Sequence, residues 1–259
     1  MKKIIFLSVL VAAVFTSCQS NDPNGSNSNG SNNLSTGQIE MKVYPDNNNN
    51  VSFSAMTQKL TIDWGDGTVD NLTPNGVGKS FPHVYSNQNL QTVKVTTSGM
   101  TGTLNDVSYN YGFALDGSAS FQELKFGNCP ELISILCGED QLSVLEIGKC
   151  PALTYLDCSY GQLTALDVSK CTSLTTLYCG DAYGGCGNQL TSLDVSKCTA
   201  LTELDCSYNQ LSASALNALF NSLPTRKSTD NATITIYENP GENTCDRTIA
   251  TKKGWTVSF

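Results

Sequence analysis

Apolar positions return with a fixed period through the second half of the chain. Four segments repeat the order Leu, two residues, Leu or Ile, one residue, Cys, and they begin at Leu132, Leu153, Leu174 and Leu201. The first three starts lie 21 residues apart, and the fourth lies 27 residues further on, because GDAYGGCGN near 181–187 adds six residues. A fixed period of this length is typical of repeat architectures, in which similar units stack on one another.

Alternation inside a unit predicts short strands. Because successive side chains of a strand point to opposite faces, Leu156 and Cys158 are expected to point together into the core. The phrase LTALDVSKC repeats the phrase LTYLDCSYG within one unit, so each unit is expected to contain two similar strands. A half-unit that begins at Phe121 starts the array, which ends at Leu211.

The regular cysteines are expected to be part of the core, since a thiol packs as a small apolar group. One set belongs to the predicted strands and the other to the predicted turns. The strand set is Cys137, Cys158, Cys179 and Cys206, and the turn set is Cys129, Cys150, Cys171 and Cys198.

Metal binding and disulfide formation are the alternatives to a core role. No two cysteines have the C-x-x-C-like spacing of a zinc site, so neither a metal nor another cofactor is expected. Disulfides occur in exported proteins, but stacked parallel strands orient the Cβ atoms poorly for a bridge. Cys186 lies in the Gly-rich insertion, and it either pairs with a neighbour or is buried locally.

The unit L-x-x-L-x-C-x-x-[N/G/D]-x-L resembles the leucine-rich repeat, with Cys at the third apolar position. This resemblance implies a short right-handed solenoid over residues 121–211. After it, SASALNALFNSLP predicts a helix that ends at Pro224, and the remaining sequence predicts a strand and a short helix. Residues 212–259 are therefore expected to form a C-terminal cap, which a repeat array needs to cover its last unit.

Residues 38–98 have a different pattern, rich in Thr and Val and without cysteine. LTIDWGDGTVD, followed by FPHVY and TVKVT, resembles the polycystic-kidney-disease (PKD) family and implies a small Ig-like β-sandwich. Asp63 and Asp66 lack the further carboxylates of a calcium loop, so they are expected to cap a turn, with His83 packed in support. Residues 99–120 are expected to be a transition segment or an N-terminal cap. The whole chain is thus predicted to be mainly β with a little α.

The N-terminus has the features of an export signal. Lys2 and Lys3 precede the apolar stretch IIFLSVLVAAVF, which is too short to span a bilayer. The following FTSC resembles a bacterial lipoprotein signal, which implies removal of residues 1–17 and diacylation of Cys18; an ordinary secretory signal is the alternative. Residues 18–37 are rich in Asn, Ser and Gly and are expected to form a flexible tether.

Charge and motifs exclude several classes of function. Without residues 1–17, which hold two lysines and no acid, 13 basic and 23 acidic side chains leave a formal net charge of −10. Nucleic acid is therefore not an expected partner, because its phosphates would be repelled. The single histidine, His83, has no nucleophile motif beside it, and no phosphate-binding or zinc motif is present, so no enzyme activity is expected.

The two carboxylates of a glycoside hydrolase come together only in the folded protein, so a sequence pattern identifies such a pair poorly. The acids of the array, however, recur at one kind of position, directly after a Leu, as on a solvated strand face. They are Asp157, Asp167, Asp194 and Asp205.

The outward strand positions of the repeat are the candidate ligand-binding site. They are expected to form two files across the units, with Tyr160 and Tyr208 at their margin. One file is Ser134, Tyr155, Thr176 and Glu203, and the other is Leu136, Asp157, Tyr178 and Asp205. Exposed Tyr beside Asp is common in protein and sugar recognition, although these side chains are also compatible with a face that is merely soluble.

The combination of segments resembles predicted surface lipoproteins of the Bacteroidetes, which implies a partner outside the cell. We expect a non-enzymatic lipoprotein of the bacterial outer membrane, anchored through Cys18 and surface-exposed, that binds an extracellular protein or glycan. The alternatives are a periplasm-facing structural or assembly component and an accessory carbohydrate-binding subunit of a polysaccharide-uptake system.

Overall fold

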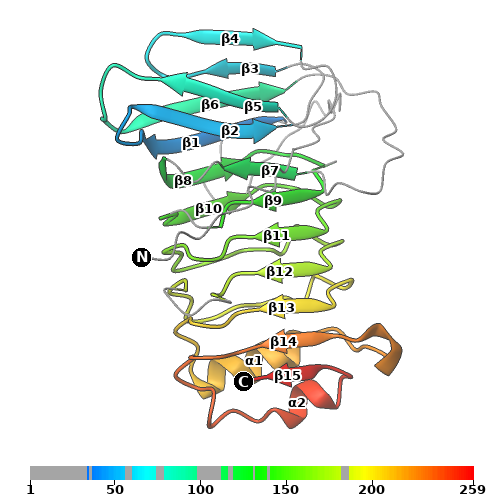
Figure 1. Cartoon of the computed structure of the whole chain (residues 1–259). Coiled ribbons are helices and arrows are strands. Elements are labelled where there is room, and N and C mark those ends of the chain that lie inside the picture. Colours follow the sequence, from blue (N-terminus) through cyan, green and yellow to red (C-terminus); the bar gives the residue numbers. More distant parts are fainter. Residues whose placement is uncertain are drawn as a thin grey trace.

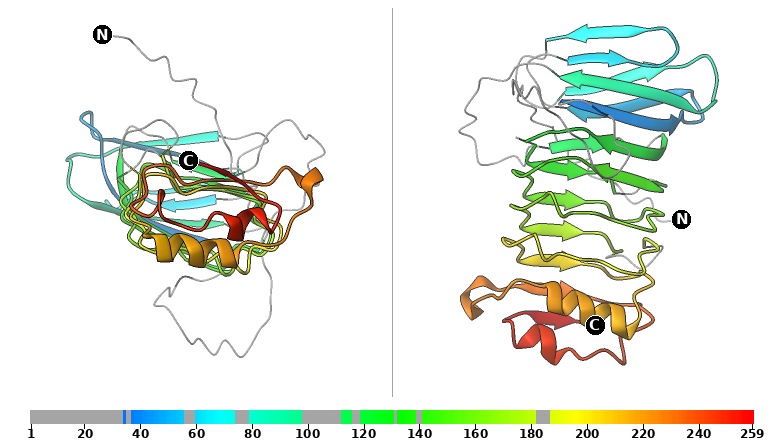
Figure 2. Two further views of the ribbon diagram at one scale, coloured as in Figure 1. Left: turned by 90° about the horizontal axis from the view of Figure 1, so that it is seen from below. Right: turned by 180° about the vertical axis from the view of Figure 1, so that it is seen from behind.

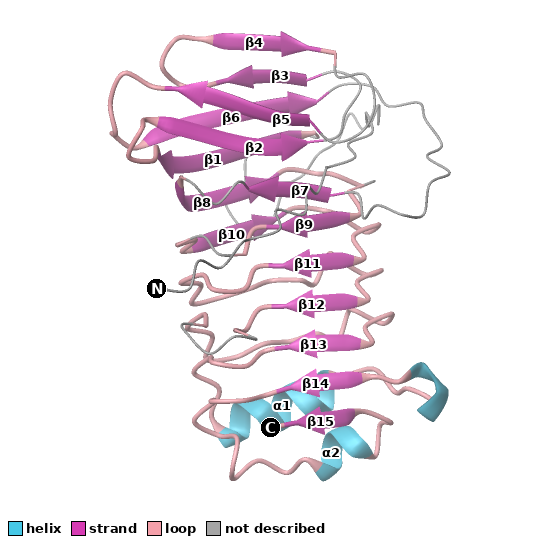
Figure 3. Cartoon of the chain, viewed as in Figure 1, coloured by secondary structure: helices cyan, strands magenta, loops and turns pink. Residues whose placement is uncertain are grey.

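The computed structural model describes residues 34, 37–55, 60–73, 79–97, 112–115, 119–130, 132–138, 141–181 and 187–259. In these residues the protein is mainly β, as predicted, and its helices lie near the C-terminal end (Figure 3). No helix in the described residues is long and apolar enough to cross a membrane. The predicted signal segment, Cys18 and Cys186 lie outside the described residues.

One sheet has six strands in the order β10-β8-β1-β6-β3-β4. β1 pairs antiparallel with β6 and β8, whereas β8 pairs parallel with β10. Alternate side chains of β1 are buried, namely Ile39, Met41 and Val43, because one face of the sheet covers the core. The strands are β1 (Gln38–Tyr44), β3 (Leu60–Asp63), β4 (Val69–Leu72), β6 (Gln91–Thr97), β8 (Ser120–Phe126) and β10 (Val144–Ile147).

The second sheet has nine strands in the order β15-β14-β13-β12-β11-β9-β7-β2-β5. The strands from β9 to β15 in this sheet are parallel and in register, and we call them the parallel stack (Figure 1). Each of the rungs from β9 to β14 buries one central aliphatic side chain, such as Leu156, Leu177 or Leu204. The strands are β2 (Asn50–Ala55), β5 (Lys79–Val84), β7 (Gly112–Leu115), β9 (Ser134–Leu136), β11 (Tyr155–Asp157), β12 (Thr176–Tyr178), β13 (Glu203–Asp205), β14 (Thr233–Thr235) and β15 (Thr256–Ser258).

Both sheets continue from the N-terminal antiparallel strands into the repeat region. β7 pairs antiparallel with β2 and parallel with β9. Likewise, β8 pairs antiparallel with β1 and parallel with β10. The buried side chains form one hydrophobic core that extends from Ile39 to Trp255. The parallel stack therefore lies below β1–β6, joined to them through β7 and β8, as Figure 1 shows.

The repeat units contain fewer strands than predicted. The second strand of a unit is present in the first one, as β10, but the corresponding segments 165–168 and 192–195 are not strands. There the Asp167 and Asp194 carboxylates accept the backbone N–H of the residue two positions later, each at 2.8 Å. Such a local hydrogen bond competes with a strand ladder for the backbone. The prediction of two strands in every unit is wrong for these later units.

The C-terminal part contains both α-helices. α1 (Ala213–Ser222) begins after Ser212, whose hydroxyl accepts the Ala215 N–H at 3.2 Å, and it ends before Pro224, which confirms the predicted helix. A 3₁₀ turn, η1 (Ser228–Asp230), and α2 (Thr248–Thr251) follow. In the end-on view of Figure 2, α1 lies along one side of the stacked turns.

Candidate functional site

The outward side chains of β9, β11, β12 and β13 form one surface, which we call the strand face. Parallel pairing places Tyr155 opposite Thr176 and Asp157 opposite Tyr178, and the same register continues to β9 and β13. The two predicted files are thus side by side. The strand face consists of Ser134, Leu136, Tyr155, Asp157, Thr176, Tyr178, Glu203 and Asp205.

Tyr155 and Tyr178 are the aromatic centre of the strand face. Their ring centroids are 5.7 Å apart and the ring planes meet at 88°, an edge-to-face arrangement that aromatic pairs prefer. The Tyr178 hydroxyl donates a hydrogen bond to the Glu203 carboxylate. Burial, followed by the charges of Asp157 and Glu203, raises the pKa of Tyr155 to about 12. Both rings are half-buried, so a ligand can reach part of each phenol in its neutral form.

Asp157 and Asp205 lie on the strand face but are half-buried. Each carboxylate accepts the backbone N–H of the Ser two residues later, at 3.1 Å for Ser159 and 2.9 Å for Ser207. Burial raises the pKa of Asp157, although the hydrogen bonds from Ser159 act in the opposite direction. The prediction that these two acids are solvated is wrong, because the turn after each strand folds back over the carboxylate.

Ser134 has the outward register of the strand face, but it is only 1 % exposed. Its predicted place on an open surface is therefore wrong. Its hydroxyl has no hydrogen-bond partner among the residues that the structure describes. Leu136, on the same strand, is half-buried. The accessible part of the strand face is accordingly centred on β11, β12 and β13.

Tyr160 and Tyr208 occupy equivalent turn positions beyond β11 and β13. Both have left-handed φ angles, 59° and 50°, which residues other than Gly rarely adopt. Their backbone N–H groups donate to the carbonyls of Gly180 and Tyr237 in the next unit, at 3.3 and 2.7 Å. These backbone bonds fix the turns in which the two half-buried Tyr residues lie, and their place at the margin of a ligand-binding face stays a prediction.

Three buried asparagines were not expected as key residues, although the [N/G/D] position of the repeat is where they occur. The Asn209 amide donates to the carbonyls of Cys179 and Cys206, and its oxygen accepts the Leu190 N–H at 2.9 Å. Asn188 and Asn239 make equivalent bonds on either side. This asparagine ladder fixes the turns that carry the strand face.

All eight regular cysteines are buried, and none of them forms a disulfide. The Cys179 and Cys206 thiols donate to backbone carbonyls of the next unit at 3.3 and 3.4 Å. Burial raises the pKa of Cys198 to about 11, and it raises the pKa of Cys158 well above the usual range. In the described part of the chain, no group of three or more His, Cys, Asp or Glu side chains could hold a metal ion.

The WGDGT segment forms a capped turn. The carboxylates of Asp63 and Asp66 each accept the backbone N–H of the residue two positions later, at 3.0 Å. His83 Nε2 lies 2.8 Å from Asp66 Oδ2, and its ring stacks on Trp64 with centroids 4.5 Å apart. Burial opposes ionisation of Asp66, but the hydrogen bonds from Thr68 and His83 outweigh it and lower its pKa to about 2. The expected capping and packing roles at this turn are confirmed.

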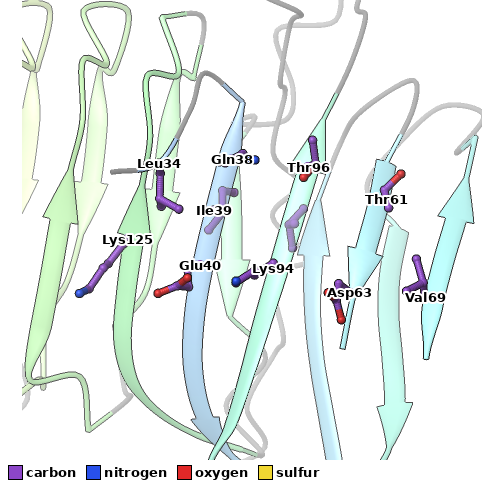
Figure 4. Close-up of a pocket in the computed structure, with 11 residues that line it drawn as sticks. Leu34, Gln38, Ile39, Glu40, Thr61, Asp63, Val69, Lys94, Thr96 and Lys125 are labelled. Atoms are coloured by element: carbon purple, nitrogen blue, oxygen red, sulfur yellow. The ribbon is translucent and has the colours of Figure 1, made fainter. Parts of the chain in front are cut away.

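A shallow depression of about 690 Å³ lies on the outer face of the six-stranded sheet (Figure 4). Opposite charges alternate in one row across its strands, through Asp63, Lys94, Glu40, Lys125 and Glu146. Lys125 lies 3.3 Å from Glu146. Opposite charges on neighbouring strands stabilise a sheet, and here they leave little excess charge for a ligand.

Comparison of the chain with protein families, characterised proteins and solved structures gave no match. The geometry of the strand face is therefore the basis for assigning a function.

Proposed function

We propose that this protein is a non-enzymatic lipoprotein of the bacterial outer membrane whose strand face binds an extracellular protein or glycan. In this proposal residues 38–98 form a PKD-like β-sandwich, and residues 121–211 form a short right-handed leucine-rich repeat solenoid with residues 212–259 as its cap. Lipid on Cys18 anchors the chain. No cofactor or nucleic acid takes part.

The observation that carries this proposal is the side-by-side arrangement of aromatic and acidic side chains on three neighbouring strands. Tyr155 and Tyr178 present half-exposed rings next to Glu203 and Asp205. Rings that already pack against each other lose little further freedom on binding, and the carboxylates accept hydrogen bonds from a ligand. The face is small, so binding by many copies on one cell is expected to strengthen attachment.

The geometry favours binding over catalysis. Asp157 and Asp205 already accept hydrogen bonds from the Ser159 and Ser207 backbone, and these bonds close the turns. Two acids that serve as turn caps are poor candidates for the paired acid and base of a glycosidase, which must exchange protons with the substrate.

Protease treatment of intact producing cells tests the proposed location. External protease is expected to cleave the full-length chain, while a periplasmic control protein stays intact. Cleavage of the chain only after lysis would overturn the surface location and favour the periplasm.

The triple variant Tyr155→Ala/Tyr178→Ala/Asp205→Asn tests the strand face itself. We expect it to lose binding to any immobilised extracellular protein or glycan that retains the wild-type protein, with the thermal midpoint lowered by a few degrees at most. A matched control replaces the exposed Lys149, Lys170 and Lys197 with Ala and is expected to bind normally. Equal binding by the triple variant would show that the ligand contacts another surface.

A further inference from the structure

We propose that the strand face receives cationic side chains of a protein partner, Lys or Arg residues that lie about 10 Å apart on one side of a polyproline II segment. This inference rests on the proposed function, since it names the ligand chemistry of the same face.

Uncompensated negative charge is the first argument. The strand face has three acids and no Lys, Arg or His among its eight residues. Within the described residues, Asp157, Glu203 and Asp205 form no ion pair. On the six-stranded sheet, by contrast, Lys42 is paired with Glu123 at 2.8 Å. The strand face therefore carries negative charge that no cation in the described residues neutralises.

The aromatic pair is the second argument. The face of a Tyr ring attracts ammonium and guanidinium groups, and nearby carboxylates add to this attraction. Tyr155 and Tyr178 meet at 88°, so they form a corner and not the flat platform on which a sugar ring stacks. Beside Tyr155 in the register, the buried Ser134 hydroxyl has no hydrogen-bond partner among the described residues. An N–H donor that reaches past the ring would find an acceptor there.

The spacing of the acids gives the third argument. Asp157 and Asp205 lie on either side of Tyr178 in one file, two strand spacings apart, which is about 10 Å. In a polyproline II chain, which has three residues per turn, residues i and i+3 point to the same side and are separated by about 9 Å. Two cations at positions i and i+3 of such a segment can thus meet both carboxylates, with the ring of Tyr178 between them.

A labelled peptide with lysines three residues apart, GKGGKGGKG, tests the inference by fluorescence polarisation at low salt. The test variant is Asp157→Asn/Asp205→Asn, because Asn keeps an acceptor for the Ser N–H. Its matched control is Asp167→Asn/Asp194→Asn, which removes the same charge from two other turn-capping acids. We expect the test variant to bind the peptide at least about tenfold more weakly than the wild-type protein, and the control variant less than about twofold more weakly. The two differ because salt screens distant charges, so that only charges close to the bound lysines contribute much. The peptide with acetylated lysines should not bind.

Equal weakening in the two variants would overturn the inference, because it would mean general attraction to an acidic chain. Absence of peptide binding to the wild-type protein would overturn it as well. A parallel panel of neutral hexasaccharides separates the two proposals. If a hexasaccharide binds and Tyr155→Ala/Tyr178→Ala abolishes its binding, the cation inference fails while the proposed function stands. If the triple variant binds the ligand as well as the wild-type protein does, the strand face is not the binding site, and both the cation inference and the proposed function fail.

Discussion

At the scale of single residues, the turns of neighbouring units depend on each other. The Asp205 carboxylate that caps its own turn lies over Gly180, where a Cβ atom would be 2.6 Å from the carboxylate oxygen. Asp157 lies over Gly138 in the same way, at 3.0 Å. Units with the sequence Asp-Cys-Ser thus alternate with units that have Gly in place of the Ser. In the unit between the two Asp-Cys-Ser units, Tyr178 stands in place of the Asp, so it lies between Asp157 and Asp205 on the strand face.

The asparagine ladder makes a prediction at this scale. Asn209→Ala is expected to lower the free energy of unfolding by about 1–3 kcal/mol, because the buried Leu190 N–H loses its acceptor. The carbonyls of Cys179 and Cys206 each lose one donor and keep the bond from Asn188 or Asn239. Denaturant unfolding of the purified protein measures the change. The exposed neighbour Gln210→Ala is the control and should be near neutral. Equal stability of the two variants would mean that water replaces the amide without cost.

At the scale of elements, the strand set of cysteines follows β9, β11, β12 and β13 at one equivalent position. Each thiol is buried between neighbouring rungs and packs as a small apolar group. Because burial disfavours the thiolate, these elements are expected to resist thiol reagents as long as the strands stay paired.

Thiol counting tests this expectation in a chain with Cys18→Ser and Cys186→Ser. At pH 8 the native protein should react at one thiol at most, the partly buried Cys245. In denaturant without reductant all nine remaining cysteines of the original eleven should react. The additional change Cys245→Ser should remove the native reaction. Fewer than nine thiols in denaturant would reveal disulfides.

At the scale of the whole molecule, the predicted boundary near residue 98 does not separate two sheets. β8 pairs with β1 so that Phe126 lies opposite Ile39 and Leu124 opposite Met41, and all four side chains are buried. The antiparallel strands and the repeat region therefore complete each other's core.

Truncation tests this dependence. A chain of residues 112–259 is expected to aggregate or melt at a markedly lower temperature than residues 34–259, because it exposes the apolar face of β8 and two unpaired strand edges. Size-exclusion chromatography and thermal unfolding measure the outcome. The longer chain should unfold in one transition. A monomeric short fragment with an unchanged midpoint would mean that the repeat region folds independently.

Local sequence patterns were sufficient to predict the repeat period, the strand register, the capped WGDGT turn and the C-terminal helix. A slip of one residue would turn Leu and Cys outward, so alternation alone specifies the register. Turn caps and helix ends likewise depend on residues a few positions apart. The candidate site was predictable to the same extent, since the two files of Tyr and acidic residues follow from the period.

The tertiary structure decided which distant segments pair and how deeply each outward residue is covered. Lys42 and Glu123 are 81 residues apart yet contact each other across β1 and β8, and no local period encodes such a pairing. The outward register of Ser134 gives no sign that its side chain is fully buried, and that of Asp157 and Asp205 gives no sign that the following turns half-bury their carboxylates. Burial is a sum over everything that surrounds a side chain, and only the folded arrangement of remote segments supplies that sum.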